Sequence, residues 1–277
     1  MPINERLDKR RGQLVCRERK FVSRLTKASS NQEILAVLNE TADAVGVVLR
    51  ANTDWSLSGL RDTQYSVDLR ADAAALEVLT NAGVAILSEE SEITGVFGDD
   101  DICVVIDPLD GSTNASRGVP WFATALCAID KNGMRAGLVV NQAMRNDSYW
   151  ATAGGGAFHN GVAMRPSSCV ELREAIVGIS GIPKQRPKWA QFRALGAAAL
   201  DICLVADGVL DAWIDFNQHG VWDYLASALI CQEAGAQIVE HQDRSLVVHE
   251  HGQRRTPIVA ATPELLAIAR QIRAQQT

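Results

Sequence analysis

The sequence of 277 residues lacks several features that mark specialised classes of protein. No apolar run approaches the roughly 20 residues that span a bilayer, and the N-terminus has no apolar core of a secretory signal. The six cysteines stand far apart without a CxxC pair, which favours buried free thiols over a disulfide framework or a zinc site. These absences predict a cytoplasmic globular protein with no membrane contact.

The five histidines form no pattern of metal ligands. His159 lies in a predicted turn, His219 in a predicted loop, and the other three in one polar stretch near the C-terminus. We expect surface or loop roles for them, although His219 is close to Asp223 in the sequence and is a candidate for contact with a substrate.

Charge is distributed unevenly along the chain. Residues 1–30 contain nine Lys or Arg and three Asp or Glu and carry +6, whereas the remaining 247 residues carry −12. The basic segment is typical of a solvated extension, with contact to nucleic acid or an acidic partner as the alternative. The acidic main body argues against nucleic-acid binding, because a phosphate backbone requires a basic face.

The pattern of apolar residues predicts an α/β protein. Spacings of three and four indicate amphipathic helices over 31–49 and 68–79. Short apolar strands and Asn-Gly turns follow, and they predict an antiparallel meander. In the last 100 or so residues strands alternate with helices. We therefore expect a basic extension over 1–30 and a single domain over 31–277, with an α+β half over 31–150 and an α/β half over 151–277.

Acidic residues stand where predicted strands end. Glu89 and Glu90 follow one strand, and Asp107 ends the next. Pro108 fixes a turn that brings Asp110 back toward Asp107, so these two carboxylates are placed to share a metal ion. Carboxylate oxygens are the hard ligands that Mg²⁺ prefers. The glycine that follows this turn lets the backbone approach closely, which predicts a phosphate-binding site beside the metal.

Each acidic motif also has a purely structural interpretation. Paired glutamates are usually solvated, and Asp-Pro and Asp-Gly are common turn dipeptides. Asp223 after Trp222 is, by itself, a helix N-cap next to an apolar staple. The combination of all three motifs favours a functional site.

Four segments together resemble the inositol monophosphatase family. The stretch VVIDPLDGSTN at 104–114 is similar to the family's first signature, and Trp222-Asp223 followed by a small-residue helix ending EAGA is similar to its second. SEES at 88–91 and GGGAFHNG at 154–161 resemble two further family motifs. They occur in the family's order over about residues 31–275, which is far more specific than any single motif.

The resemblance implies a layered fold like that of inositol monophosphatase and fructose bisphosphatase, and a homodimeric phosphatase that uses two or three Mg²⁺ ions. It implies that Glu89, Asp107 and the Leu109 carbonyl bind the first metal. It further implies that Asp107, Asp110 and Asp223 bind the second, so that Asp107 bridges the two.

The remaining roles also follow from the resemblance. Ser112, hydrogen-bonded to Asp68, is similar to the hydroxyl and acid pair that orients the attacking water, and Glu90 to the supporting acid. Backbone N–H groups at Gly111 and Ser112 are expected to hold the phosphate. The residues expected to contact the organic part of the substrate are Gly196, Ala198 and Asp215.

Several positions depart from the family pattern and leave the substrate open. Ser112 replaces the commoner Thr and keeps the hydroxyl, Gln142 stands where the family has proline, and Asp215 is shorter than the usual Glu. The first candidate activity is hydrolysis of an inositol monophosphate. The alternatives are fructose-1,6-bisphosphatase, histidinol phosphatase or another small-molecule phosphatase. A different alternative is a non-catalytic regulatory protein whose basic arm contacts RNA or a polymerase.

Overall fold

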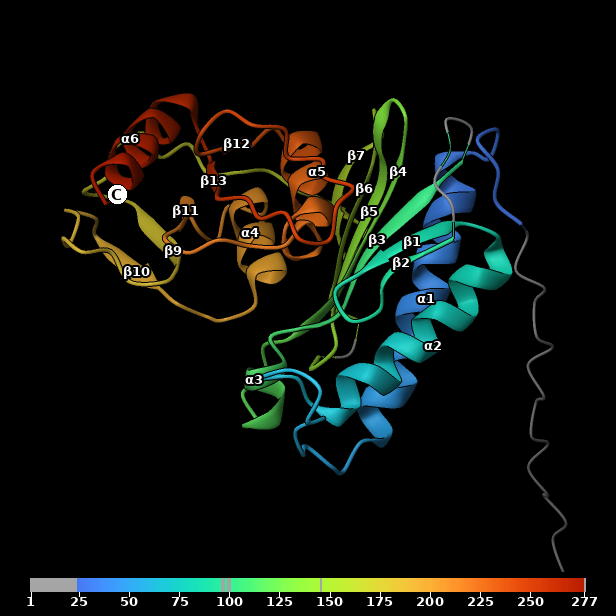
Figure 1. The fold of residues 1–277 in the computed structure, drawn as a ribbon. Helices are drawn as coiled ribbons and strands as arrows, with labels where there is room; N and C mark the ends of the chain where they lie inside the picture. Colours follow the sequence, from blue (N-terminus) through green and yellow to red (C-terminus); the bar gives the residue numbers. More distant parts are fainter. Residues whose placement is uncertain (1–23, 96–97, 99–100, 145, 277) are drawn as a thin grey trace, which may run out of the picture.

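The protein is described by a computed structural model that covers residues 24–95, 98, 101–144 and 146–276. Two β-sheets lie side by side, with helices between them and on both outer faces (Figure 1). Helices α1 (Asn31–Ala51) and α2 (Ser66–Ala82) cover one face of the first sheet. Helices α4 (Ala198–Ala206) and α5 (Leu225–Ala234) lie between the sheets, and α6 (Pro263–Ala274) covers the far face of the second. This arrangement is the α/β class expected from the sequence.

The first sheet has eight strands in the order β2-β1-β3-β4-β5-β6-β7-β8. Strand β1 pairs with β3 in parallel, and the strands from β3 to β8 form the predicted antiparallel meander. At the β7–β8 turn, Asn160 and Gly161 both have positive φ, as a tight Asn-Gly hairpin requires. The strands are β1 (Ala85–Ser88), β2 (Glu92–Thr94), β3 (Cys103–Asp110), β4 (Ala123–Asp130), β5 (Gly133–Asn141), β6 (Ser148–Thr152), β7 (Gly156–His159) and β8 (Val162–Ala163).

The second sheet has five strands in the order β10-β9-β11-β13-β12. Strand β9 pairs in parallel with β10 and β11, whereas β13 is antiparallel to both of its neighbours. The strands are β9 (Ile176–Ser180), β10 (Gln191–Arg193), β11 (Ala212–Asp215), β12 (Gln237–Glu240) and β13 (Pro257–Ala260).

Some helix ends show how free backbone groups are satisfied. Ser30 and Glu33 form a capping box at the start of α1, and Gly83 ends α2 in the left-handed conformation. The helices are α1 (Asn31–Ala51), α2 (Ser66–Ala82), α3 (Ser112–Ser116), α4 (Ala198–Ala206), α5 (Leu225–Ala234) and α6 (Pro263–Ala274), with the 3₁₀ helix η1 (Val221–Asp223) before α5.

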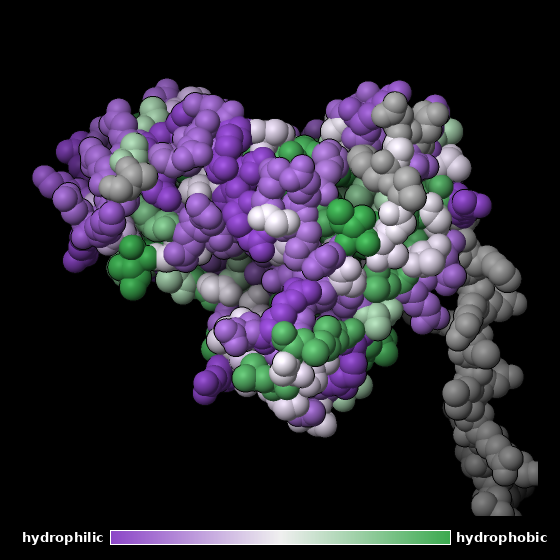
Figure 2. Space-filling model, viewed as in Figure 1, coloured by the Kyte–Doolittle hydropathy of each residue, from purple (hydrophilic) through white to green (hydrophobic). Residues whose placement is uncertain are grey.

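Three buried apolar clusters fill the spaces between these layers. The largest lies between the two sheets around α4 and α5, and another lies beneath α1 and α2. Figure 2 shows that the viewed face is largely hydrophilic, with apolar residues gathered over the part of the molecule that contains α3. Buried polar residues, among them Asp107, Asp110 and Asp201, interrupt these apolar layers.

The boundary between the halves differs from the sequence-based expectation. The first sheet continues to Ala163, so strands β7 and β8 lie beyond the division expected at 150/151. Of the basic segment 1–30, residues 1–23 lie outside the described residues, and the described Leu25 is buried. Among the described residues, no helix combines the length and the apolar character needed to cross a membrane.

Candidate metal centre

Three carboxylates from separate elements converge at one point of the structure. Glu89 follows β1, Asp107 belongs to β3 and Asp223 ends η1, and one carboxylate oxygen of each lies within 4.8 Å of the other two. The parallel register pairs Ser88 with Ile106, so the next residue on each strand is one of these acids. The β1–β3 pairing thus places Glu89 and Asp107 side by side, and η1 supplies Asp223 from the C-terminal half.

The turn after Asp107 interrupts the pairing of β3 with β4. Asp107 pairs with Ala125 and Asp110 with Ala123, so β3 contains an extra residue at this point. The backbone N–H of Leu109 donates to Asp107 Oδ1 at 2.9 Å and closes the turn. Thr124 Oγ1 donates to the Pro108 carbonyl at 2.9 Å and holds the turn from the other strand. This local irregularity points the Asp107 carboxylate toward Glu89 and Asp223.

Asp110 has a second role that the sequence pattern did not indicate. Its two carboxylate oxygens accept the backbone N–H groups of Ala198, at 3.2 Å, and Ala199, at 2.8 Å, at the start of α4. Each oxygen retains a further lone pair, so these contacts leave Asp110 able to bind a cation. Asp110 lies outside the group of three converging carboxylates but is close enough to Asp223 for the two charges to interact.

Simultaneous ionisation of these three acids and Asp110 is energetically unfavourable. Burial, followed by the charges of neighbouring acids, raises the pKa values of Glu89, Asp107 and Asp110 well above their usual range. Burial also raises the pKa of Asp223, partly offset by the nearby His219. Like charges at such a site require either protons or a cation. The donor set consists of carboxylate oxygens, and it fits a hard divalent ion.

The expected Ser112 and Asp68 pair lines a small cavity of about 100 Å³ beside this cluster, together with Glu89, Glu90 and Leu109. No hydrogen bond joins Ser112 to Asp68 in the described part of the structure, and Asp68 Oδ2 accepts the Tyr65 N–H at 2.8 Å. Asp68 Oδ1 is buried without a partner in the described structure. Burial raises the pKa of Asp68 to about 7. An acceptor atom is therefore free next to the acid cluster.

Two residues near the cluster were missed in the sequence analysis. Arg61 donates to the carbonyls of Glu89, at 2.9 Å, and Glu90, at 2.5 Å, while His251 Nε2 lies 3.0 Å from the Glu89 carbonyl. The His251 ring also packs on Trp222, with ring centroids 4.6 Å apart. Both residues come from loops, whose polar composition gave no signal of a specific contact. They fix the backbone that carries the two glutamates.

A second cavity, of about 280 Å³, borders the acid cluster. Asp110 and Asp223 line it, together with the expected substrate residues Gly196 and Ala198. Asp215, the third residue expected to contact the organic part of the substrate, does not line this cavity. Its carboxylate is fully buried and is held by His219 Nδ1 at 2.9 Å and by the Asn217 N–H at 2.8 Å. In this arrangement the Asp215 carboxylate does not face a substrate in the cavity directly.

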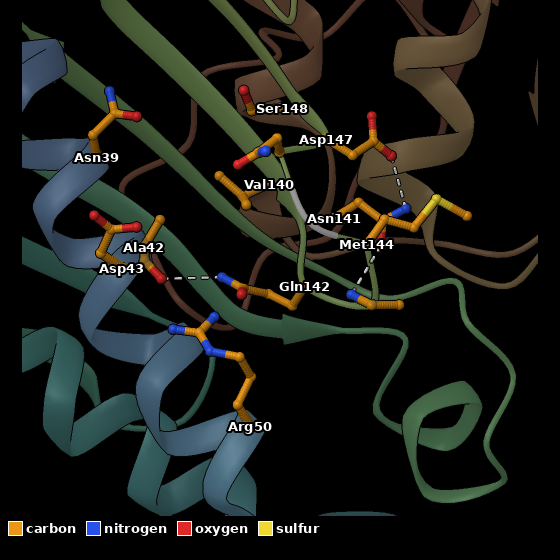
Figure 3. A pocket seen from close by; sticks show the side chains of 12 residues that line it. Asn39, Ala42, Asp43, Arg50, Val140, Asn141, Gln142, Met144, Asp147 and Ser148 are labelled. Atoms are coloured by element: carbon orange, nitrogen blue, oxygen red, sulfur yellow. Dashed lines mark hydrogen bonds between the residues drawn. The ribbon is translucent and has the colours of Figure 1, made fainter.

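Gln142, which departs from the family pattern, connects α1 to the metal turn. Its Nε2 donates to the Ala42 carbonyl at 3.0 Å (Figure 3). It also donates to Thr124 Oγ1 at 3.0 Å. Thr124 Oγ1 in turn donates to Pro108. The side chain thus supports the turn from a polar pocket of about 590 Å³ that is lined by α1 and the segment after β5, and that contains none of the clustered acids.

Comparison with known proteins agrees with this geometry. The sequence profile described as the inositol monophosphatase family matches residues 30–276. A fructose-1,6-bisphosphatase/inositol-1-monophosphatase of Archaeoglobus fulgidus is 34% identical over 208 residues, which are 72% of this chain and 79% of that protein. The Nus factor SuhB of Escherichia coli is 33% identical over 220 residues, 73% of this chain and 78% of that protein.

Solved structures show the same fold. An inositol monophosphatase–fructose 1,6-bisphosphatase matches with a TM-score of 0.75 and 26% identity over 86% of this chain and 98% of that one. The suhB protein of Bartonella henselae, at 24% identity and a TM-score of 0.73, covers 88% of this chain and 99% of its own length and supports the fold alone. Profile, relatives and fold agree, and the chain belongs to the inositol monophosphatase family.

Proposed function

We propose that this protein is a Mg²⁺-dependent phosphatase that hydrolyses the phosphate monoester of a small polyol or sugar, with an inositol monophosphate as the first candidate. The observation that carries the proposal is the convergence of Glu89, Asp107 and Asp223 within 4.8 Å. A protein has no structural reason to gather several buried and half-buried carboxylates at one point, because each raises the cost of ionising the others. A bound cation removes that cost.

The acids would hold two or three Mg²⁺ ions through Glu89, Asp107, Asp110, Asp223 and the Leu109 carbonyl. When bound, Mg²⁺ supplies positive charge for the phosphate oxygens and for the leaving oxygen, and it makes a water molecule easier to deprotonate. Phosphate ester hydrolysis depends mainly on charge stabilisation and alignment of the nucleophile, so no histidine or cysteine nucleophile is needed.

The chain's own residues would position water and phosphate. Ser112 Oγ and the unpartnered Asp68 Oδ1 line the same cavity, where the serine hydroxyl can donate to Asp68 and accept from a water molecule. The pKa of Asp68, about 7, suits a group that takes up a proton near neutral pH. Glu90 would support this side of the site, and the backbone N–H groups of Gly111 and Ser112 would hold phosphate oxygens.

A panel of substrates tests the proposal. Purified protein with Mg²⁺ is incubated with myo-inositol 1-phosphate, fructose 1,6-bisphosphate, histidinol phosphate and adenosine 3′,5′-bisphosphate, and released phosphate is measured. We expect Mg²⁺-dependent release from at least one of the first three, and none with the Asp107→Asn variant. Absence of release from all four, or equal release by the variant, would contradict the proposal.

A second candidate function is regulatory binding. It is favoured by the relatives named Nus factor SuhB, at 33% identity. On this alternative the fold serves as a surface for RNA or a polymerase, and the substrate panel gives no turnover although the protein binds such a partner. The retained acid cluster favours the enzyme. We also propose that the protein is a cytoplasmic homodimer, the dimer being implied by the family; equilibrium sedimentation tests the oligomeric state.

A further inference from the structure

Ser88, the last residue of β1, stands directly before Glu89 and Glu90 and is fully buried. Its hydroxyl donates to the carboxylate of Asp72, with Oγ 2.6 Å from Oδ1. Asp72 lies on the buried face of α2, one turn after Asp68, and its side chain is also buried. This contact therefore joins α2 to the end of the strand that carries a clustered acid, although neither partner belongs to the group of converging carboxylates.

The direction of each hydrogen bond at Ser88 is fixed by its partners. The backbone N–H of Glu90 lies 3.2 Å from Ser88 Oγ and can only donate to it. The hydrogen of the hydroxyl is then free to point at Asp72, where a carboxylate acceptor makes the stronger kind of hydrogen bond. The Asp72 carboxylate thus sets the orientation in which Ser88 holds the Glu90 N–H.

These contacts hold a tight turn between β1 and β2. The three residues after Ser88 form the connection, and Glu92, which follows them, has a φ of 61°. A glutamate in this left-handed region is strained, so the turn requires contacts that hold it. With the Ser88 contact, the backbone N–H and carbonyl groups of Glu89 and Glu90 all have partners, because Arg61 donates to both carbonyls.

The carboxylates of Glu89 and Glu90 face different partners although the residues are neighbours. The Glu89 carboxylate converges with the other two clustered acids, whereas that of Glu90 accepts from Gln64 and lies 3.9 Å from the Arg61 guanidinium. The peptide unit between the two glutamates sets the direction of both side chains, and its N–H is the one that Ser88 holds. Rotation of this peptide unit would turn Glu89 away from the cluster.

Asp72 is an expensive residue to place on an apolar helix face. Ala71, Ala75 and Leu79 are buried on the same helix. Burial raises the pKa of Asp72, and the hydrogen bond from Ser88 offsets part of that rise. An apolar side chain of similar size would fill the space without the cost of burying a carboxylate. The orientation of the Ser88 hydroxyl is a task that such a side chain could not perform.

We propose that Asp72 and Ser88 are positioning residues that fix the peptide unit between Glu89 and Glu90 and thereby hold the Glu89 carboxylate in place for a divalent cation. The inference rests on the proposed function for the identity of that cation. Both residues act through Glu89 and take no part in the chemical step. Their loss should weaken Mg²⁺ binding and leave the reaction at saturating Mg²⁺ intact.

The first test measures the Kd of the purified protein for Mg²⁺ alone by titration calorimetry. Ser88→Ala removes the acceptor for the Glu90 N–H, and Asp72→Ala removes the group that orients it, so we expect the Kd to rise roughly tenfold in both variants. Asp72→Asn keeps an oxygen that accepts from Ser88 and should stay within about threefold of the wild type. At saturating Mg²⁺, kcat should remain within about twofold of the wild type in all three variants.

Thr41→Ala is a control for general loss of stability. The Thr41 hydroxyl is fully buried and donates to the Val37 carbonyl at 2.8 Å within α1, which carries none of the clustered acids. We expect this variant to have a lower Tm and an unchanged Kd for Mg²⁺. A Kd that rises equally in Thr41→Ala and Ser88→Ala would show that both act through stability, and would overturn the positioning role.

Hydrogen exchange of the Glu90 amide tests the same contact without metal. In EDTA the Glu90 N–H depends on Ser88 Oγ, whereas the Glu89 N–H donates to the Ile106 carbonyl at 3.2 Å and serves as the internal reference. We expect Glu90 exchange to rise roughly tenfold relative to Glu89 in Ser88→Ala and Asp72→Ala, and to keep the wild-type rate in Asp72→Asn.

The two measurements separate this inference from the phosphatase proposal. Wild-type Mg²⁺ binding with an unchanged Kd in Ser88→Ala, or an unchanged exchange rate of the Glu90 amide in that variant, would overturn the positioning role and leave the proposed function standing. Absence of Mg²⁺ binding by the wild type would contradict the proposed function, and the exchange rates would still decide whether Asp72 and Ser88 hold the turn.

Discussion

The carboxylate of Asp110 accepts the backbone N–H of Ala199 at 2.8 Å and so joins the end of β3 to the first turn of α4. These residues lie in different halves of the molecule, and Ala199 belongs to the large apolar cluster between the sheets. A negative charge at a helix N-terminus also interacts favourably with the helix dipole. The contact therefore fixes how the two halves meet at the acid cluster.

This contact predicts that Asp110→Ala destabilises the metal-free protein. The variant leaves the N–H groups of Ala198 and Ala199 without their acceptor, which should lower the free energy of unfolding by about 1 to 3 kcal/mol. Asp107→Asn is the matched control, because its amide oxygen can still accept the Leu109 N–H while one charge leaves the crowded cluster. Urea denaturation in EDTA should show a loss for Asp110→Ala only. Equal losses in both variants would contradict the capping role.

Ser112 provides a prediction about the attacking water. If its hydroxyl positions that water with Asp68, Ser112→Ala should reduce kcat by about 10²- to 10⁴-fold, the range typical of a positioned proton-transfer group. The Mg²⁺ concentration for half-maximal activity should barely change, because the carboxylates remain. Ser112→Thr keeps the hydroxyl with a more restricted rotamer and should retain most activity. A fully active Ser112→Ala enzyme would show that the hydroxyl has no such role.

Asp201 provides a prediction about pH. Burial raises its pKa to about 7 against the hydrogen bond from Trp121, compared with about 3.8 for an exposed aspartate. The folded state thus holds the proton more tightly than the unfolded state does. The stability from this proton is complete below about pH 4 and is lost as the pH rises through 7. Asp201→Asn keeps the Trp121 contact without titrating.

The measurement is the Tm of metal-free wild type and Asp201→Asn between pH 4 and 8. Because both proteins contain the same acid cluster, the difference between their Tm values isolates Asp201. We expect the wild type to lose Tm relative to the variant as the pH rises. A difference that is constant across this range would show that Asp201 ionises at its ordinary pKa.

Residues 24–30 provide a prediction about truncation. The basic segment 1–30 was expected to be a solvated extension, yet Leu25 is buried and Ser30 caps α1. Ser29 also accepts from Arg135 at 2.9 Å. Deletion of 1–30 should therefore lower the free energy of unfolding by about 3 kcal/mol relative to deletion of 1–23, from the lost apolar burial and cap. Equal stability of the two truncations would show that these contacts contribute nothing.

Local patterns in the sequence predicted much of the fold. The helices over 31–49 and 68–79 and the Asn160-Gly161 turn depend on neighbouring residues, and the structure has them. The α/β class and the family are confirmed. The meander through the Asn160-Gly161 turn was expected, and the structure has its strands in one sheet to Ala163. The expected division at 150/151 cuts through this sheet, because a change in strand rhythm does not mark where a sheet ends.

The candidate site shows the same limit. Glu89, Asp107 and Asp223 carry recognisable motifs, and the structure brings them together. The contacts of His251 and Arg61 with the Glu89 backbone join segments far apart in sequence, so no local pattern marks them. Asp215 was expected to contact substrate because the family resemblance places a substrate-binding acid near this position. Its withdrawal behind His219 depends on side-chain orientation, which spacing does not encode.

The central claim is that Glu89, Asp107 and Asp223 hold Mg²⁺ for phosphate hydrolysis. It is tested most directly by measuring Mg²⁺-dependent phosphate release from myo-inositol 1-phosphate, or the preferred substrate of the panel, by wild type and by folded Asp223→Asn. A neutral amide cannot balance adjacent dications, so we predict that the variant loses at least about 10² in kcat. Release by Asp223→Asn at the wild-type rate, or release by the wild type that is unaffected by EDTA, would contradict the account.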